Sequence, residues 1–543
     1  MTWLVRQRAQ WGQASIEKML GALPVVAGFC SRLRIRELVD AACPVRDVAQ
    51  LTHGQVIEVL VANRLTSPAP LVHVQDWARA WAVGETFGTD PELLNDDRIG
   101  RALDAIAPHL EQLAGSVGLA TIEAFGLDAA RLHWDMTSIS LHGDYEQAEP
   151  AFATPRFGHP KDRRPDLKQI QAGIAVTADG AIPVLHRAYD GAAGEVGQVI
   201  GAMQGLQKLA GPQRMLMIGD SKLISYANLA AMTAAGVAFI APASKQYVGA
   251  AALAGQKIGD ATRVDYVAAR DEHKSADRRG LWHVREDDTM TLAGPRKKDP
   301  ILTLRRIFVH SSARAQAAAT ARAKKLDRAR DDLARLERGL GSRHYPTEQA
   351  VADRLAAIGR DRRVSTYLTA ATGTDPATGK PTLTWHFDQN AIDAEAATDG
   401  WYALLTNLPP EAADAEQVLR HYKGQEAVER RYQAFKGPLA VTNLYLKNNR
   451  RIHALITVIC LALLIFCLIE RQARQALADR GETKVNGLYA GRPAVPTGKL
   501  ILDALAGIRL IPGTGQSPPT IPQPTDLQLD LLDLLGIDPR DLR

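Results

Sequence analysis

The 543-residue chain is poor in cysteine and in aromatic side chains, which make up 6% of it. None of its four cysteines belongs to a CxxC pair or lies at a zinc-binding distance from histidines along the sequence. We therefore expect a reducing compartment, with neither a disulfide framework nor a structural zinc site. The start, MTWLVRQRAQWGQ, lacks the apolar core of a secretory signal. No P-loop or GxGxxG motif is present, so no nucleotide site is predicted.

Long apolar runs are also scarce. One stretch, ALITVICLALLIFCLI at residues 454–469, contains sixteen uncharged residues, whereas roughly 20 are needed to span a bilayer. We interpret it as a buried helix of a large domain and expect no membrane partner. A membrane anchor is the alternative, and solubility without detergent distinguishes the two.

Composition otherwise indicates a globular protein. Hydrophobic residues make up 46% and charged residues 23% of the chain, and the formal net charge is +5. A chain of this length is expected to form about two to four structural units. The positive balance is a weak indication of polyanionic partners, because many soluble enzymes share it.

Hydrophobic periodicity divides the chain into five regions. Residues 1–125 have apolar residues at helical spacing and predict a helical N-terminal domain. Residues 126–244 follow the order strand–strand–strand–helix–strand–helix–strand, which predicts a mixed α/β sheet flanked by helices. Residues 396–490 resume this pattern with a strand at 401–407, one helix from about Ala415 to Phe435, and the apolar helix. Residues 491–543 form a predicted Pro-rich tail.

Residues 245–395 interrupt the α/β pattern and are predicted to be an inserted domain. They contain polar stretches, a strand at LRRIFVHS and a long charged helix. Apolar residues of that helix, from Leu326 to Leu340, alternate at spacings of three and four, as in a coiled coil. Because the run is short, an antiparallel helical arm is favoured over a dimer zipper.

Three acids occupy positions at which a carboxylate can carry chemistry. Asp135 interrupts the apolar strand RLHWDMTSIS, Asp220 follows the strand RMLMI, and Glu429 lies on the helix YKGQEAVERRYQAFK. Acids at the ends of adjacent parallel strands meet at one edge of a sheet. A third acid on a helix over that edge would complete a set of oxygen ligands suited to Mg²⁺. Two such ions about 4 Å apart promote phosphoryl transfer.

Each acid also has a structural interpretation that spacing alone leaves open. Asp135 could form a buried hydrogen bond with Thr137 or Ser138, because an isolated buried carboxylate is costly. Asp220, before a helix, could be an N-cap. Glu429, next to two arginines, could be an ordinary surface charge.

The surroundings of Glu429 narrow these alternatives. On one continuous helix, five positions would share a face: Tyr422, Gln425, Glu429, Tyr432 or Gln433, and Lys436. An acid flanked by a tyrosine and a lysine suits a metal site with a phosphate backbone alongside it.

This pattern resembles the Tyr-x2-Arg-x3-Glu-x6-Lys signature of DDE insertion-sequence transposases of the YREK group. In this chain the signature falls on Tyr422, Gln425, Glu429 and Lys436, with glutamine in place of arginine. The stretches HWDMTS, GHPKDRRPDLKQ, IGDSK and DGWYALLTN resemble the same group, so the similarity extends over roughly residues 10–510. It implies a ribonuclease-H-like catalytic core with a large inserted domain between the second and third acids.

The resemblance also implies a reaction. Asp135, Asp220 and Glu429 would hold two Mg²⁺ or Mn²⁺ ions, water would cut the transposon end, and the freed 3′-hydroxyl would attack target DNA. Tyr422 and Lys436 would contact phosphates of the terminal strand. Gln425 lacks the charged bidentate grip of arginine, so a clamp role there is in doubt, and Lys423 or Arg430 could replace it.

Further partners follow from the resemblance: the terminal inverted repeats, recognised by the N-terminal helical domain, target DNA, and a second copy of the chain in the DNA complex. A cytoplasmic, nucleoid-associated location is expected. Two basic segments are candidate DNA contacts, since basic residues release counterions on binding phosphate. They are the loop with Lys161, Arg163, Arg164 and Lys168, and the segment KNNRRIH with Arg450 and Arg451.

Both basic segments also have interpretations that involve no DNA. The loop could simply be solvated, Arg450 and Arg451 could cap the next helix, and His159 is a minor candidate for a catalytic helper. For the whole protein, the alternatives are a ribonuclease-H-like nuclease not tied to transposition and an inactive DNA-binding derivative. Retention of all three acids disfavours the inactive derivative.

Overall fold

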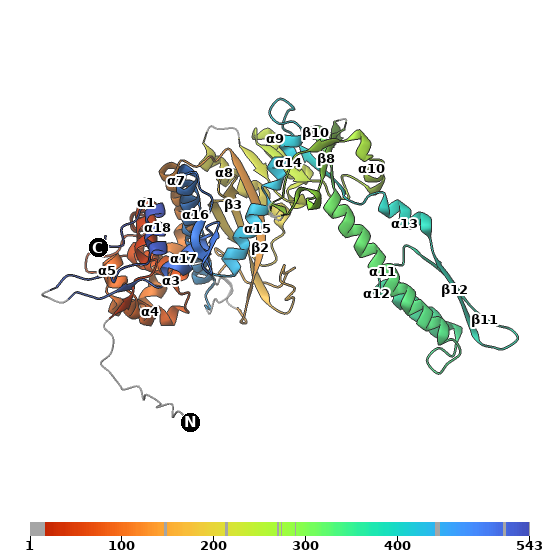
Figure 1. Ribbon diagram of the computed structural model, residues 1–543, viewed down its shortest axis with the longest axis horizontal. Coiled ribbons are helices and arrows are strands. Elements are labelled where there is room, and N and C mark those ends of the chain that lie inside the picture. Colours follow the sequence, from red (N-terminus) through yellow and green to blue (C-terminus); the bar gives the residue numbers. More distant parts are fainter. Residues whose placement is uncertain are drawn as a thin grey trace, which may run out of the picture. The chain divides into compact units, whose positions relative to one another are not determined.

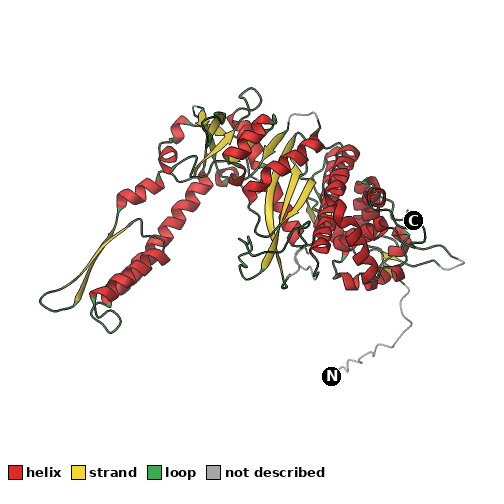
Figure 2. Ribbon diagram, turned by 180° about the vertical axis from the view of Figure 1, so that it is seen from behind, coloured by secondary structure: helices red, strands yellow, loops and turns green. Residues whose placement is uncertain are grey.

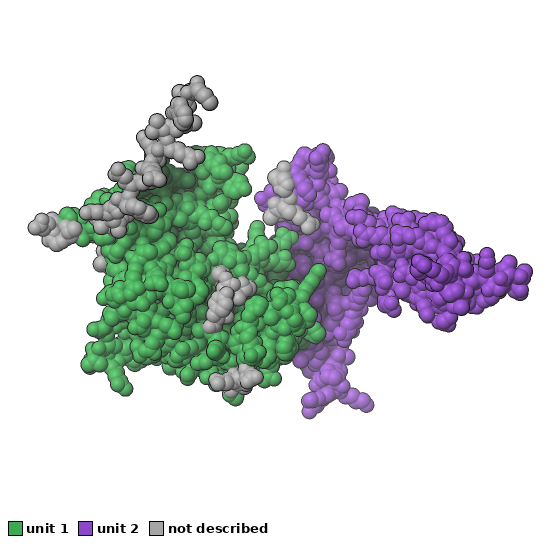
Figure 3. All heavy atoms as spheres, turned by 90° about the horizontal axis from the view of Figure 1, so that it is seen from below, with its two compact units in different colours: residues 1–217, 424–543 green, residues 218–423 purple. Residues whose placement is uncertain are grey.

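The computed structural model describes residues 17–145, 149–211, 215–268, 271–272, 274–287, 289–439, 446–513 and 517–541. It is a mixed α/β protein (Figures 1 and 2). The chain divides into two compact units, coloured in Figure 3: unit 1 comprises Met1–Met217 and Gly424–Arg543, and unit 2 comprises Ile218–Lys423. Strand β5 (Leu216–Ile218) contains the first boundary between them.

The N-terminal part of unit 1 is helical, as periodicity predicts. Local signals fix the helix ends. The helix at 53–66 begins at a capping box between Thr52 and Gln55, and the helix at 110–125 ends at Gly126, which has the left-handed conformation. The helices are α1 (Leu23–Arg32), α2 (Ile35–Ala42), α3 (His53–Thr66), α4 (Val74–Ala80), α5 (Val83–Phe87), α6 (Asp96–Ile106) and α7 (Leu110–Phe125).

Three antiparallel strands follow in the order predicted: β2 (Arg131–Leu141), β3 (Lys168–Thr177) and β4 (Pro183–Tyr189). Asp135 lies opposite Ile174 of β3, which lies opposite His186 of β4. The turn between β3 and β4 has Gly180 at φ +75°. After Lys168, every residue of β3 is buried, so this central strand is covered on both faces. Helix α8 (Val199–Ala210) comes next.

The predicted apolar helix is longer than the uncharged run that identified it. Helix α16 extends from Asn449 to Asp479, because charged residues continue it at both ends. By length and composition it could cross a membrane, yet its most apolar stretch is 94% buried within the structure. It packs against β4 and the N-terminal helices α3 and α6. This burial supports the interpretation as a core helix.

The C-terminal region is more ordered than the predicted Pro-rich tail. It contains β14 (Val485–Tyr489), β15 (Arg492–Ala494), α17 (Gly498–Leu505), β16 (Arg509–Leu510) and α18 (Asp526–Leu535). Leu531 and Leu535 are buried, and α17 and α18 pack on α16. Strand β16 pairs with β1 (Lys18–Met19), so the C-terminal part is built into the helical region. Most prolines of this region lie in the connections, with Pro493 in β15, and the leucines of α17 and α18 supply the helical spacing between them.

Unit 2 contains an antiparallel sheet with the order β6–β13–β10–β8–β7, and β9 also pairs with β10. The predicted strand at 401–407 is confirmed as the second of these. The strands are β6 (Ala238–Pro242), β7 (Thr262–Val264), β8 (Trp282–Glu286), β9 (Met290–Leu292), β10 (Leu302–Ser311) and β13 (Trp401–Thr406). The accompanying helices are α9 (Tyr226–Ala234), α10 (Ala250–Ala254), α13 (Gln389–Ala396) and α14 (Ala415–Lys423).

The predicted helical arm is present in unit 2. Helix α11 (Ser312–Arg338) packs against α12 (Glu348–Asp361), and a hairpin of β11 (Leu368–Thr374) and β12 (Pro381–Phe387) lies beside them (Figure 1). The predicted seam is buried: Leu333 and Leu336 share an apolar cluster with Ile358. The apolar seam of α11 is therefore covered within the chain.

The single helix predicted from Ala415 to Phe435 is wrong. Helix α14 ends at Lys423, and α15 (Glu426–Lys436) begins after a turn at Gly424 and Gln425. In this turn the amides of Ala427 and Val428 bond to carbonyls only three residues back. Glycine costs about 1 kcal/mol in a helix interior relative to alanine, which favours a break here. The predicted five-residue face therefore belongs to two helices.

Helix α15 is fixed in unit 1 by a buried arginine. The guanidinium of Arg431, 8% exposed, donates to the carbonyls of Ala181 at 3.0 Å and Gly180 at 2.6 Å, and pairs with Glu470 of α16 at 3.2 Å. Glu470 in turn accepts from the Gly498 amide at 3.1 Å. One side chain thus joins α15 to the β3–β4 turn and to α16.

We expect Arg431→Met to lower the stability of unit 1 by about 2 kcal/mol, because the carbonyls of Gly180 and Ala181 lose their donor and Glu470 keeps only Arg474 as a charged partner. Arg430→Met, at the exposed neighbouring position, should change it by about 0.5 kcal/mol at most. Native-state hydrogen exchange of amides in α15 and β3 measures both. Equal protection in the two variants would contradict this role of Arg431.

Candidate active site

The candidate site is built on β2, where Asp135 interrupts a buried strand. Its side chain is 16% exposed, while Trp134 and Met136 on either side are buried. One carboxylate oxygen accepts the Met136 amide at 2.8 Å. The apolar neighbours hold the strand in the sheet, so the carboxylate is presented from a rigid element.

Helix α15 lies directly on this strand. The Tyr432 hydroxyl donates to the Asp135 carbonyl at 2.5 Å and approaches the Ala172 carbonyl of β3 at 3.4 Å. Tyr432 is buried, and this burial, together with the Asp135 carboxylate, raises its pKa well above the usual value. The hydroxyl therefore remains a neutral donor that binds α15 to the backbone of the first acid.

Gln425, at the motif arginine position, holds the start of α15 on the same strand. Its amide nitrogen donates to the Trp134 carbonyl at 3.2 Å, and its amide oxygen lies 3.2 Å from Nδ1 of His133. The side chain is thus engaged with β2 rather than directed to solvent. With Tyr432, it fixes α15 to the β2 backbone at Trp134 and Asp135.

Glu429 and Lys436 lie on this anchored helix. Glu429 is exposed, and among the described residues no hydrogen bond or ion pair with it is present. Lys436 is half-buried. Burial lowers its pKa and repulsion from Lys161 adds to this, while Asp162 opposes the shift. Lys436 therefore lies close to the basic loop.

The loop before β3 brings a lysine to Asp135. Lys161 Nζ lies 3.4 Å from a carboxylate oxygen of Asp135 and 3.4 Å from one of Glu195, and it also donates to the Met136 carbonyl. Burial lowers the pKa of Lys161, but the two carboxylates outweigh it and the net shift is upward. The Lys161 amide donates to Ser138 Oγ at 2.9 Å, which fixes the loop on β2.

The other loop residues face different surroundings. Arg164 pairs with Asp166 at 2.7 Å, and the Lys168 ammonium lies over the Phe157 ring, 5.9 Å from its centroid. Arg163 is exposed at a tight turn with φ +62°. His159, the minor catalytic candidate, is also exposed. Within this loop, then, only Lys161 contacts a predicted acid.

Two acids of the candidate site were not predicted from the sequence. Glu195 opens the short 3-10 turn Glu195–Gln198, and Asp162 accepts from the Ser140 hydroxyl at 2.5 Å. Glu195 neither interrupts an apolar strand nor belongs to a motif, so the sequence offered no signal for it. Asp162 lies in the stretch GHPKDRRPDLKQ, of which only the basic residues were predicted to act.

The remaining motif residues belong to unit 2. Asp220 is the N-cap of the short turn Ser221–Leu223, and its carboxylate accepts from the Lys222 amide at 2.9 Å. On α14, Tyr422 packs near Tyr402, with ring centroids 6.3 Å apart. Lys423 places its ammonium 4.1 Å from the centroid of Trp282. Asp220 therefore takes the capping role that its sequence context allowed.

The second predicted basic segment is paired with acids. Arg451 makes two hydrogen bonds to the Asp104 carboxylate, at 3.0 and 2.7 Å. Arg450 lies 3.1 Å from Asp104 and 3.7 Å from Glu149. These contacts tie the start of α16 to α6. Both arginines thus stabilise the packing of α16 on α6, and their contact with DNA stays a prediction.

No metal-binding cluster is apparent in the described part of the chain: no three His, Cys, Asp or Glu side chains there lie close enough together to hold an ion. Asp135 and Glu429 belong to unit 1 and Asp220 belongs to unit 2. The oxygens that do converge are those of Asp135, Glu195 and the Met136 carbonyl, and they surround the Lys161 ammonium.

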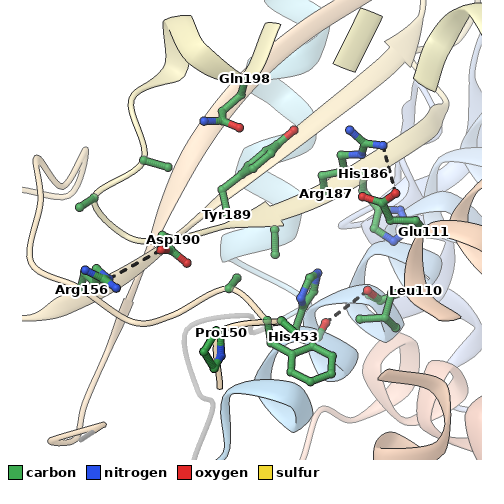
Figure 4. Close-up of a pocket in the computed structure, with 17 residues that line it drawn as sticks. Leu110, Glu111, Pro150, Arg156, His186, Arg187, Tyr189, Asp190, Gln198 and His453 are labelled. Carbon is green, nitrogen blue, oxygen red and sulfur yellow. Dashed lines mark hydrogen bonds and ion pairs between the residues drawn. The ribbon is translucent and has the colours of Figure 1, made fainter. Parts of the chain in front are cut away.

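A separate cavity of about 550 Å³ lies in unit 1 between β4, α7, α16 and the loop at 150–156 (Figure 4). Among its lining side chains, His186 Nε2, Tyr189 Oη and His453 Nδ1 are buried without a protein hydrogen-bond partner. Burial, with mutual repulsion, lowers the pKa of His186 to about 4, and burial lowers that of His453 to about 4. Both imidazoles are thus neutral at pH 7. None of the three predicted acids lines this cavity.

Comparison with known proteins gives a family for part of the chain. Residues 15–113 match a family described as a domain of unknown function, DUF4277. No curated protein is similar to the chain. Similar solved structures include a cryo-EM structure of a piggyBac transposase synaptic complex with hairpin DNA. It is 10% identical over 89% of this chain and 78% of that chain, with a TM-score of 0.32. A similarity this low does not establish a common fold.

The two histidines that line this cavity predict acid sensitivity. Their pKa falls from 6.5 in the unfolded chain to about 4 in the folded one, so below pH 6.5 the unfolded state binds more protons. We expect the midpoint of thermal unfolding to drop progressively from pH 6.5 to 4, and the double variant His186→Gln, His453→Gln to show a shallower drop. His142→Gln, at an exposed histidine, is the control. An unchanged slope in the double variant would contradict the assignment.

Proposed function

We propose that this chain is a transposase that cuts DNA at the ends of its own element and joins them to target DNA. In this proposal a ribonuclease-H-like core carries Asp135, Asp220 and Glu429 as the catalytic acids. The supporting observation is the anchoring of α15 on the strand of the first acid. The hydroxyl of Tyr432 and the amide of Gln425 contact the backbone of β2 at Asp135 and Trp134, respectively.

The matched family adds support from a different part of the chain. The domain at residues 15–113 is of a kind found in transposases. It coincides with the helical N-terminal region, for which we propose recognition of the terminal inverted repeats. Pairing of two such ends would place two copies of the chain in the active DNA complex, in a cytoplasmic, nucleoid-associated setting.

The three acids would hold Mg²⁺ or Mn²⁺, with two ions proposed. When bound, these ions supply an activated attacking oxygen and stabilise the leaving oxygen. The surroundings of Asp135 suit such a cation, because two carboxylate oxygens and a carbonyl already converge on a positive charge there. In this proposal, the protein holds Asp135 rigidly through β2 and keeps Glu429 exposed on the anchored helix α15.

DNA binding is proposed for residues around this acid. We propose that Lys436 and Tyr422 contact phosphates of the terminal strand, as the family motif implies, and that Arg163 of the basic loop contacts phosphate as well. Lys161, Arg164, Lys168, Arg450 and Arg451 all have interactions within the chain, so phosphate binding there would require exchange of partners. Gln425 is engaged with β2, and we assign it to positioning α15 rather than to gripping phosphate.

We expect Asp135→Asn, Asp220→Asn and Glu429→Gln each to reduce cleavage of DNA carrying the element's ends by about 100-fold or more while DNA binding is retained. The control is Glu426→Gln, one turn earlier on α15. Cleavage with Mg²⁺ and gel-shift binding, measured together, test this. Full cleavage by the three variants would refute the site. Cleavage of any DNA regardless of its ends would favour the nuclease alternative, and binding without cleavage by the native chain would favour the inactive derivative.

Lys436→Gln should weaken DNA binding about equally for all sequences and reduce the slope of log affinity against log salt by about 1, because one phosphate contact is lost. Lys208→Gln, at an exposed lysine of α8, is the control and should leave the slope unchanged. DNA-binding titrations between about 50 and 200 mM salt, a range over which phosphate contacts change the affinity strongly, measure the slope. Identical slopes for the native chain and Lys436→Gln would exclude a phosphate contact.

A further inference from the structure

The Lys161 ammonium lies where a metal ion would meet Asp135. Its nitrogen is 3.4 Å from Asp135 Oδ1 and 3.4 Å from Glu195 Oε1, and it donates to the Met136 carbonyl. Three hard oxygen atoms from three positions thus surround one positive charge. Carboxylate and carbonyl oxygens are the donors that Mg²⁺ and Mn²⁺ use in proteins.

The attachment of the lysine lets the ammonium leave without moving the loop. The Lys161 backbone amide is held by Ser138 Oγ at 2.9 Å, whereas the side chain is 43% exposed. Its two carboxylate partners are far less exposed, at 16% and 21%. Side-chain rotation alone can therefore take the ammonium into solvent and leave the oxygens in place.

The electrostatics explain why a cation is needed there. Asp135 and Glu195 carry like charges on poorly exposed side chains, so a positive charge between them is favourable. The Lys161 ammonium, 3.4 Å from an oxygen of each, supplies that charge. Lys436, close enough to repel it, and Asp162 are the other charged groups beside the loop. A divalent ion offers the same oxygens twice the charge.

We propose that Asp135, Glu195 and the Met136 carbonyl form a cation site that Lys161 fills until a divalent ion displaces it. This rests on the proposed function only in taking Asp135 as a metal ligand. It adds Glu195 as a ligand from outside the motif. Lys161 is then an internal competitor that lowers metal affinity and offsets part of the charge of the two acids when metal is absent.

Binding of Mn²⁺ to the full chain without DNA, followed by electron paramagnetic resonance and calorimetry, tests the proposal. Lys161→Met should bind Mn²⁺ about tenfold more tightly than the native chain, because a competing charge is removed. Lys161→Arg retains the charge and should show no such gain. Glu195→Gln should bind about tenfold more weakly, and Lys208→Met should match the native chain.

A double variant locates the effect. In an Asp135→Asn background, Lys161→Met should no longer increase affinity, and a gain that persists would place the ion elsewhere and overturn the proposal. Equal Mn²⁺ affinity of Lys161→Met and the native chain would overturn it too. Should Lys161→Met fail to fold by circular dichroism, Lys161→Gln, which keeps a polar head group, replaces it in every comparison.

The result of the Mn²⁺-binding experiment does not depend on whether the chain cuts DNA. DNA cleavage with a Mn²⁺ affinity insensitive to Lys161 would leave the transposase proposal standing and remove the cation site. A Lys161-dependent Mn²⁺ affinity in a chain that cuts no DNA would do the reverse. Metal binding alone decides this inference, and cleavage alone decides the function.

Discussion

The geometry of the candidate site depends on how α15 is held against the sheet. Arg431 and Tyr432 are adjacent in sequence, and together they bind three elements: the β3–β4 turn, α16 and the backbone of β2 at Asp135. These contacts are buried or partly buried and use backbone carbonyls or a paired carboxylate, so the helix can neither slide nor rotate without leaving polar groups unsatisfied. Glu429 owes its position on the exposed side of α15 to this anchoring.

Several basic residues that were predicted to contact DNA are paired with acids inside the chain. Asp104 neutralises Arg451 and lies close to Arg450, Asp166 pairs with Arg164, and Asp135 shares Lys161 with Glu195. A count of basic residues in the sequence therefore overstates the charge that is available to a polyanion. Electrostatic attraction of DNA depends on the few uncompensated groups and on exchange of internal partners for phosphates.

Much of the fold could be predicted from periodicity, and the departures have identifiable causes. The strands β2 to β4, the helical arm and the burial of α16 follow from patterns that a single segment carries by itself. The prediction of one long helix at 415–435 failed because a single glycine in a good helical pattern is weak evidence for a break. Here that glycine does mark an interruption. The C-terminal helices were missed because prolines in the connections dominated the composition.

The candidate site was less predictable than the fold. Asp135 stood out because a carboxylate in an apolar strand needs a reason, and Tyr432 was one of two residues expected on its face of the helix. Glu195 had no local signal, since only tertiary folding brings it to the site, and Asp162 was passed over within a stretch noted for its basic residues. The engagement of Gln425 with β2 could not be read from the sequence either, because an amide fits solvent, phosphate and backbone equally well.

The interruption at Gly424 and Gln425 also has a consequence for how the chain tolerates change. In an unbroken helix, each inserted residue would turn everything beyond it by about 100°, since a helix has 3.6 residues per turn. Here the angular setting of α15 is fixed by its own contacts to β2 and α16, downstream of the break. The large segment between Asp220 and α14 can therefore vary in length without turning Glu429 away from the strand that carries Asp135.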